Sequence, residues 1–297
     1  EFKLHSPFKP AGDQPTAIAE LTEGLLAGDK FQTLLGITGS GKTRTVASVI
    51  ENVQRPTLVM SHNKTLAAQL FRELSDFFPN NRVEFFISYY DYYQPEAYLS
   101  AQDKYIEKDL SINEEIQRLR LRATSSLLSG RRDVIIVSSV SCIYGIGSPS
   151  EYAKLIVSLK RGMEIPRNKL LYDLVELHYT RKDHDFHRGT FRVRGDVTDV
   201  FPAYSDEGLR ITQWGDEIEK LQLFDVDSGN VIEDVLEFKI YPASHYVTTK
   251  SRLEESVQQI RDELQWRNKV MIDEEKFLEA KRLEQRTLFD IEMIQEI

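Results

Sequence analysis

A glycine-rich segment followed by a lysine and a threonine is the clearest chemical feature of the sequence. Residues 36–43 read G-I-T-G-S-G-K-T and fit the phosphate-binding pattern G-x-x-x-x-G-K-[ST]. Glycines let backbone amides turn toward phosphate oxygens, and the start of a following helix adds partial positive charge. We expect ATP and Mg²⁺ to bind here, with Lys42 on the outer phosphates and the Thr43 hydroxyl on the metal ion as the catalytic pair. The candidate nucleotide-binding residues are Gly36, Thr38, Gly39, Ser40, Gly41, Lys42 and Thr43.

A glutamine upstream of this loop is a further candidate for nucleotide binding. Gln14 lies in the segment F-K-P-A-G-D-Q-P, and its amide offers the donor and the acceptor needed to read the edge of adenine. Equally, Asp13 could cap a helix whose first turn holds Pro15. The two interpretations are compatible, and both stay open.

A carboxylate that holds Mg²⁺ is missing from the expected place. Phosphoryl transfer needs an acid at the end of an apolar strand, whereas Asp133 precedes its apolar run and the acids at 216–217 and 273–274 follow none. We expect this acid to lie beyond residue 297. The last helical stretch also stops without a capping residue, so we expect a truncated chain that hydrolyses ATP negligibly on its own.

Tyrosines and arginines are concentrated in the middle of the first half. Residues 89–105 hold six of the chain's 13 tyrosines, a density that is hard to bury because each hydroxyl needs a partner. Aromatic faces on a hairpin can instead stack on unpaired bases. Residues 116–132 contain five arginines and no acid, and Arg118 and Arg122 can share a helix face. A tyrosine-rich packing surface beside a solvated helix is the open alternative.

Alternating strands and helices must position these residues. Apolar runs at 33–35, 57–60, 83–87 and 134–137 read as strands, and the segments between them have helical spacing, as at 42–53. This order predicts an α/β fold with a parallel sheet.

The pattern changes after about residue 150. Residues 151–245 contain short strands separated by turns, such as the one at 227–230, and read as a small α+β insert. Residues 249–297 read as a long charged helical stretch with an apolar stripe that includes Val257 and Leu264.

Composition excludes several classes of protein. The chain has 297 residues, a net charge of −9 and one cysteine, Cys142, so neither a disulfide framework nor a cysteine-rich zinc site is expected. No apolar run is long enough for a membrane span, and we expect a cytoplasmic protein without a membrane partner.

The net negative charge argues against a protein that coats nucleic acid by charge alone. Residues 1–150 hold 16 basic and 17 acidic groups, so a polyanion should dock on this half through a local patch.

Several motifs together resemble the UvrB family, the helicase-like subunits that verify damage in bacterial nucleotide excision repair. The motifs are G-I-T-G-S-G-K-T at 36–43, S-H-N-K-T-L-A-A-Q-L at 61–70, Y-Y-D-Y-Y-Q-P-E-A-Y at 89–98, S-S-V-S-C-I-Y-G at 138–145, F-R-V-R-G-D at 191–196 and R-L-E-Q-R-T at 282–287. The resemblance runs through essentially the whole chain, and the tyrosine run is its most specific part.

The resemblance implies a division of the chain and its partners. Residues 1–88 and 116–150 would form a RecA-like P-loop domain with a parallel sheet, and 89–115 with 246–297 a β-hairpin and helical insertion. Residues 151–245 would form the α+β domain that docks UvrA. The hairpin would pass between the strands of damaged DNA, and UvrC would bind through regions absent here.

The resemblance also implies site residues. Gln14 matches the adenine-reading position of the family. The implied DNA-binding residues are Tyr89, Tyr90, Tyr92, Tyr93, Glu96, Tyr98, Tyr105, Lys108 and Arg120. The implied UvrA-binding residues are Arg181, Arg192, Arg194 and Arg210.

The sequence departs from the family pattern in places. Ser100 stands where family hairpins commonly carry a proline, and T-Q-W at 212–214 replaces the usual E-F-F. The second RecA-like domain and its D-E-x-H motif are absent. Two other functions therefore stay open: a partner-docking module with a vestigial P-loop, and a small-molecule kinase, which would leave the tyrosine run unexplained.

Overall fold

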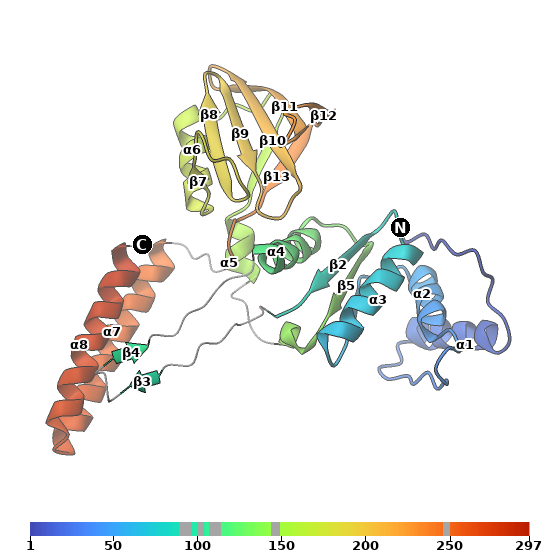
Figure 1. Ribbon diagram of the computed structural model, residues 1–297, viewed down its shortest axis with the longest axis horizontal. Helices are drawn as coiled ribbons and strands as arrows, with labels where there is room; N and C mark the ends of the chain where they lie inside the picture. Colours follow the sequence, from blue (N-terminus) through green and yellow to red (C-terminus); the bar gives the residue numbers. More distant parts are fainter. Residues whose placement is uncertain (89–96, 100–103, 107–113, 144–148, 246–249, 297) are drawn as a thin grey trace.

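The computed structural model describes residues 1–88, 97–99, 104–106, 114–143, 149–245 and 250–296. Three parts are visible in Figure 1: a part with the glycine-rich loop, a sheet-rich part beside it, and a pair of long helices. We call residues 1–88 and 114–143 the nucleotide half, and residues 151–245 the insert. The domain boundaries expected from the sequence stay a prediction.

A three-stranded parallel sheet is the centre of the nucleotide half. Its order is β1 (Thr57–Met60), β5 (Val134–Ser138), β2 (Arg82–Phe86), and both outer strands run parallel to β5. Its helices are α1 (Gln14–Ala27), α2 (Lys42–Val53), α3 (Lys64–Phe77) and α4 (Glu114–Leu128). Every residue of β5 is buried, as expected for a central strand covered on both faces. The predicted parallel sheet is therefore confirmed.

The strand expected just before the glycine-rich loop is not formed. Residues 31–37 have no strand assignment, and Phe31, Leu35 and Ile37 are 93%, 95% and 81% exposed. A strand requires a neighbour for its backbone hydrogen bonds, and no ladder joins this segment to β1. The prediction of a strand at 33–35 is wrong for this structure, because a three-residue apolar run does not specify a partner.

The insert contains a six-stranded sheet over a closed apolar core. The sheet order is β12 (Val231–Asp234), β11 (Glu217–Asp225), β10 (Glu207–Trp214), β9 (Val197–Phe201), β8 (Thr190–Arg194), β7 (Thr180–Arg181). Only β7 and β8 pair in parallel; the other neighbours are antiparallel. The remaining elements are α5 (Pro149–Lys154), α6 (Arg167–Glu176) and the antiparallel pair β6 (Val157–Lys160) and β13 (Glu237–Ile240).

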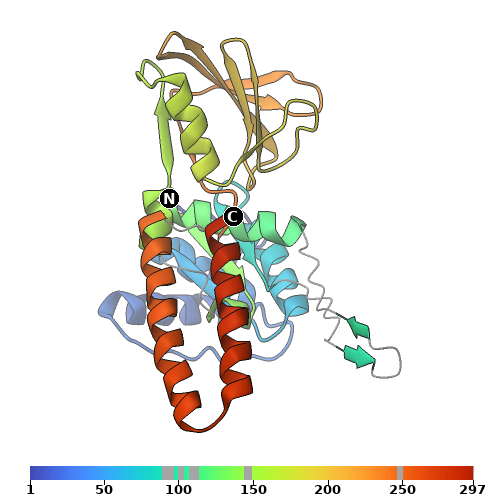
Figure 2. The ribbon, with the colours of Figure 1, turned by 90° about the vertical axis from the view of Figure 1, so that its left-hand side faces the viewer.

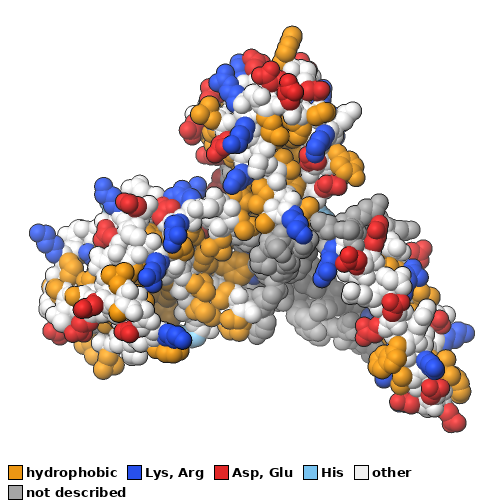
Figure 3. Space-filling view, turned by 180° about the vertical axis from the view of Figure 1, so that it is seen from behind, with side chains coloured by type: hydrophobic (Ala, Val, Ile, Leu, Met, Phe, Trp, Pro, Cys, Tyr) orange, Lys and Arg blue, Asp and Glu red, His pale blue; other side chains and the backbone are white. Residues whose placement is uncertain are grey.

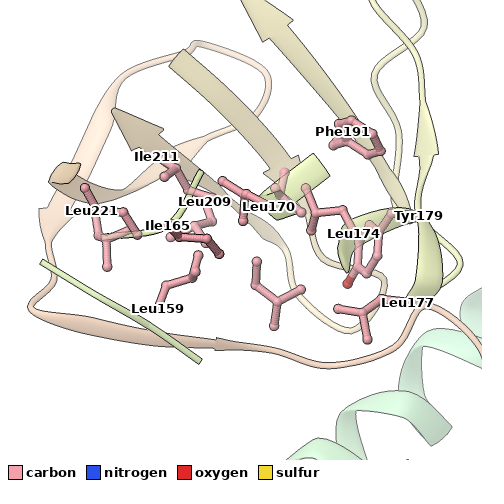
Figure 4. Close-up of a cluster of buried hydrophobic side chains, with 13 residues drawn as sticks. Leu159, Ile165, Leu170, Leu174, Leu177, Tyr179, Phe191, Leu209, Ile211 and Leu221 are labelled. Carbon is pink, nitrogen blue, oxygen red and sulfur yellow. The ribbon is translucent and has the colours of Figure 1, made fainter. Parts of the chain in front are cut away.

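Side chains from α6 and the sheet meet in the core of the insert (Figure 4). Leu170 and Leu174 of α6, with Leu209 and Ile211 of β10, are fully buried there. The predicted turn at 227–230 is confirmed, because the Ser228 N–H donates to Asp225 Oδ1 at 2.7 Å. The predicted small α+β insert is therefore present.

The last part of the chain is a helical hairpin. Helices α7 (Lys250–Asp273) and α8 (Phe277–Glu296) lie side by side in both ribbon views (Figure 2). The expected single stretch is interrupted where Glu275 adopts a φ of 60°. Val257 and Leu264 are buried, so the predicted apolar stripe does pack inward. No helix within the described ranges has the length and apolarity to cross a membrane.

A short hairpin leaves the nucleotide half between β2 and α4. Strands β3 (Ala97–Leu99) and β4 (Lys104–Ile106) pair antiparallel, with Tyr98 opposite Tyr105. In Figure 2 this pair stands clear of the helical hairpin and of both sheets. The backbone therefore forms the hairpin that the tyrosine-rich segment predicts.

Candidate nucleotide and nucleic-acid sites

The glycine-rich loop leads directly into α2. Helix α2 begins at Lys42, and Gly39 and Gly41 before it have φ values of 80° and 79°. Side chains rarely tolerate this left-handed region, so glycine is required at both places. A Cβ at Gly36 would lie only 2.7 Å from the Ser40 Oγ. The loop therefore turns tightly before α2 and leaves little room for a side chain at Gly36.

The lysine of the loop is folded back over its own backbone. Lys42 Nζ donates to the carbonyl oxygens of Gly36 at 3.0 Å and Ile37 at 2.8 Å. Thr43 follows in the first helical turn and is half-buried. A phosphate forms stronger charge-assisted hydrogen bonds than neutral carbonyls do, so an anion in the loop can draw the ammonium toward it.

Gln14 lies against the same loop. Its Nε2 donates to the Ser40 carbonyl at 3.0 Å, and its Oε1 accepts from the Ala11 N–H at 3.2 Å. A Cβ at Gly41 would come within 2.4 Å of Nε2. Asp13 occupies the N-cap position of α1 but makes no capping hydrogen bond with its side chain. The structure therefore brings Gln14 to the loop from 26 residues away.

Asp133 has a structural role at the start of β5. Its carboxylate accepts from Arg131 Nε at 3.0 Å and from Asn81 Nδ2 at 2.9 Å. The hydrogen bond from Arg131 holds the pKa of this carboxyl well below its ordinary value. Asp133 directly precedes β5 (Val134–Ser138) and is engaged by these two partners. Among the described residues no group of three or more His, Cys, Asp or Glu side chains could hold a metal ion.

Most of the predicted tyrosine site lies outside the described residues. Of its members, Tyr98 and Tyr105 are placed opposite each other in the β3–β4 pair. The residues outside the description are Tyr89, Tyr90, Tyr92, Tyr93, Glu96 and Lys108. Their roles stay predictions.

Arg120 is in the interior rather than on a DNA-facing surface. Its side chain lies in the part of α4 that packs on β2, and the residue is 4% exposed. The guanidinium carbon lies 4.3 Å from the centre of the Phe86 ring, and Nη1 donates to the Ile87 carbonyl at 2.8 Å. The implied DNA-binding role of Arg120 stays a prediction, and its burial leaves little of the side chain for direct contact with DNA. Arg120 instead fixes the chain where it leaves β2 toward the tyrosine segment.

Arg118 and Arg122 share a helix face, as their spacing predicts, and both reach the insert. Arg118 Nη1 donates to Asp206 at 3.0 Å, and Arg122 Nη1 lies 3.8 Å from the same carboxylate. Arg118 also bonds Glu115, and this hydrogen bond lowers the pKa of the Glu115 carboxyl. The sequence offers no signal for the Asp206 contact, because 88 residues separate it from Arg118.

Two of the four arginines expected to bind a partner are already paired within the insert. Arg192 and Arg210 sit on either side of Asp199 in the sheet register, with contacts of 2.9 and 2.8 Å. Arg192 stacks over Phe186, and Arg210 stacks over Phe224. These two arginines therefore stabilise the outer face of the sheet, and Asp199 balances one of their two positive charges.

The other two predicted arginines are exposed. Arg194 lies at the end of β8, and Arg181 has only a 3.5 Å contact with Asp183. The sequence reasoning did not select Trp214 as a site residue. It lies at the end of β10, opposite Glu217 of β11, and is 79% exposed. An exposed indole at a hairpin tip is a typical contact residue.

Family models match three stretches of the chain. The model described as UvrB interaction domain matches residues 157–246, and the one described as UvrB third helical domain matches residues 251–297. The model described as Type III restriction enzyme, res subunit, matches residues 7–138. With the parallel sheet of the nucleotide half, this last match confirms the predicted RecA-like α/β fold with an inserted domain.

Curated relatives are similar along the entire chain. Proteins named UvrABC system protein B are 60% identical in Caldicellulosiruptor bescii, 57% in Clostridium botulinum strain Loch Maree and 58% in Chlorobaculum tepidum. Each alignment covers 100% of this chain and 45%, 45% and 43% of the relative. The chain thus spans a little under half the length of these relatives. Two UvrB-specific models and identities near 60% along its length show that the chain belongs to the UvrB family.

Proposed function

We propose that this chain is the nucleotide- and DNA-binding part of a subunit that verifies damage in nucleotide excision repair. Its relatives carry the name UvrABC system protein B, which supports UvrA and UvrC as partners and damaged DNA as substrate. UvrC would bind the part of the relatives that this sequence does not cover. The proposal assigns ATP binding to 1–88 with 116–150, strand separation to 89–115 with 246–297, and UvrA docking to 151–245.

The observation that carries the proposal is the geometry of the glycine-rich loop. Loop amides and Lys42 would hold the ATP phosphates, the Thr43 hydroxyl would hold Mg²⁺, and Gln14 would read adenine. When bound, ATP supplies the free energy of phosphoryl transfer. The Lys42 side chain lies over the loop, and the Gln14 amide contacts the Ser40 carbonyl of the same loop.

The paired strands β3 and β4 support the DNA-binding part of the proposal. A hairpin that stands clear of the sheets can enter between two nucleic-acid strands, and tyrosine rings can stack on the bases it exposes. Arg120 would act indirectly, because its hydrogen bond to Ile87 sets where the tyrosine segment begins.

The exposed face of the insert supports partner docking. Arg181, Arg194 and Trp214 are exposed, and the buried core of the insert is made of its own residues. Such rigid aromatic and arginine side chains dominate many protein interfaces. We assign them to UvrA binding.

The nucleotide assignment is tested by titrating a fluorescent ATP analogue with Mg²⁺. Lys42→Ala should weaken binding at least about tenfold, because a charge-assisted contact to phosphate is lost. Lys30→Ala, at an exposed lysine away from the loop, is the matched control and should bind like the wild type. Loss of binding in both variants would point to unfolding, which a thermal melt detects.

A partner-docking module with an inactive loop is the second candidate. It is favoured by one observation, namely that Lys42 is already bonded to two carbonyls of its own loop. If the wild type and Lys42→Ala bind the analogue equally weakly while UvrA binding is retained, this candidate replaces the first.

A further inference from the structure

A cleft separates α4 of the nucleotide half from the insert. Its volume is about 850 Å³, and residues from both parts line it. The cationic lining residues are Arg82, Arg122, Arg131, Lys160 and Lys239. The lining carboxylates are Asp206, Glu207 and Glu237. Cations thus outnumber acids among the lining residues. Figure 3 shows lysine and arginine side chains on the surfaces of both parts.

Asp206 is the acid that joins the two walls. Arg118 Nη1 contacts both of its oxygens, at 3.0 and 3.1 Å, and Arg188 Nη2 lies 2.6 Å from it. Arg122 approaches the same carboxylate to 3.8 Å. One carboxylate therefore receives three guanidinium groups, two from α4 and one from the insert. Multiple guanidinium contacts of this kind are typical of phosphate recognition.

The two arginines of α4 are held in place independently of Asp206. Glu84, buried in β2, lies 3.2 Å from Arg122 Nε and accepts from the Ser126 hydroxyl at 2.7 Å. Arg118 bonds Glu115 on its own helix. The Asp206 side chain, by contrast, is 58% exposed. Its carboxylate can be exchanged for another anion while both guanidinium groups stay where they are.

We propose that this cleft is a phosphate-binding groove for a nucleic-acid backbone, and that Asp206 occupies the phosphate position when no nucleic acid is bound. The inference rests on the proposed DNA-binding function and adds a second contact region to the hairpin. A phosphodiester group carries the same single negative charge as the carboxylate it replaces, and it likewise presents two unbridged oxygens to the guanidinium groups. A nucleic-acid backbone also brings several such charges along the cleft. Entry of the backbone would release the contact between α4 and the insert.

The experiment compares Asp206→Asn with Asp227→Asn in binding a short fluorescent oligothymidylate. Asp227 lies in an exposed turn of the insert, so its variant makes the same change in net charge away from the cleft. Asp206→Asn should bind about two- to fivefold more tightly than this control, the range that release of an exposed ion pair allows. Equal affinities of the two variants would overturn the groove.

A second pair of variants tests the arginine directly. Arg118→Gln should bind more weakly than the wild type and lower the salt dependence of binding by about one phosphate contact. When added to Asp206→Asn, Arg118→Gln should abolish the tighter oligonucleotide binding that Asp206→Asn alone produces. Thermal melts of each variant separate lost contacts from unfolding.

The outcomes distinguish the groove from the proposed function. If the wild type binds the oligonucleotide and neither Asp206→Asn nor Arg118→Gln changes its affinity, the groove is wrong and the hairpin assignment stands. If neither the wild type nor Asp206→Asn binds, both proposals fail. At equal phosphate concentration, inorganic pyrophosphate should displace the fluorescent oligonucleotide much less than unlabelled oligonucleotide does. Equal displacement would assign the groove to small phosphates and overturn the nucleic-acid proposal.

Discussion

The insert and the nucleotide half distribute their apolar side chains very differently. In the insert, one continuous core joins β8–β11 to α6, and Leu170, Leu174 and Leu209 have no exposed surface. In the nucleotide half, the edge strand β1 leaves Leu58 and Met60 more than half exposed, and Leu35 before the loop is 95% exposed. The nucleotide half does have a buried core around β5, but its apolar side chains near the loop are exposed. The phosphate-binding geometry therefore depends on local glycine turns more than on packing around the loop.

Truncating a core residue of the insert should give the largest effect. Leu209→Ala should lower the free energy of unfolding of the insert by about 2–5 kcal/mol, because it removes contacts and leaves a cavity. Leu35→Ala is the matched change in the nucleotide half and should cost at most about 0.5 kcal/mol. Amide hydrogen exchange, followed by mass spectrometry, can assign each change to β8–β11 or to β1, β5 and β2. Similar losses of unfolding free energy in Leu209→Ala and Leu35→Ala would contradict the difference in packing between the two parts.

A buried histidine at the junction of the two parts should give a smaller, pH-dependent effect. His245 contacts the Thr124 hydroxyl oxygen at 2.9 Å and stacks on Tyr152. Burial, reinforced by Arg120, lowers the pKa of His245 from 6.5 to about 4. Between pH 6.5 and 4, His245 is protonated in the unfolded chain but mostly neutral in the folded chain. The free energy of unfolding therefore falls as the pH drops through this range. The loss should reach about 2–3 kcal/mol.

The His245 effect is isolated by difference. The unfolding free energy of His245→Gln should change less than that of the wild type over this pH range, since the titrating group is gone. His62→Gln, at an exposed histidine, should keep the wild-type slope. If the unfolding free energies of the wild type and His245→Gln depend on pH in the same way, protonation of buried His245 does not destabilise the junction of the insert with α4.

Local patterns in the sequence predicted much of this architecture. The helix at 42–53 was predicted with the bounds that the structure gives, because a glycine-rich turn and an apolar period mark its start and face. The turn at 227–230 followed from its glycine and from side chains that bond nearby backbone. The loop position of Lys42 followed from spacing alone. These features depend on contacts between residues close in sequence.

Long-range partners account for what the sequence could not predict. Arginine content indicated a nucleic-acid surface at residues 116–132, with a solvated helix as the open alternative. In the structure Arg120 is buried against Phe86, whereas Arg118 and Arg122 contact Asp206 across the proposed groove. Arg192 was expected to face a partner but pairs with Asp199 across the sheet. Composition shows how many charges a segment carries, and only the fold shows which of them remain available to a ligand.

The smallest effect on stability is expected at the exposed tip of the insert. Trp214→Ala should change the free energy of unfolding by no more than about 0.5 kcal/mol, because the indole is 79% exposed. Under the proposed function it should nevertheless weaken binding to purified UvrA by about 1–2 kcal/mol, as an interface anchor does. Trp266→Ala, at a 62% exposed tryptophan of α7, is the control and should bind UvrA like the wild type. Unchanged UvrA binding by Trp214→Ala would remove this tip from the interface. If only Trp214→Ala binds UvrA more weakly, the core of the insert provides its stability and the exposed indole contributes to binding the partner.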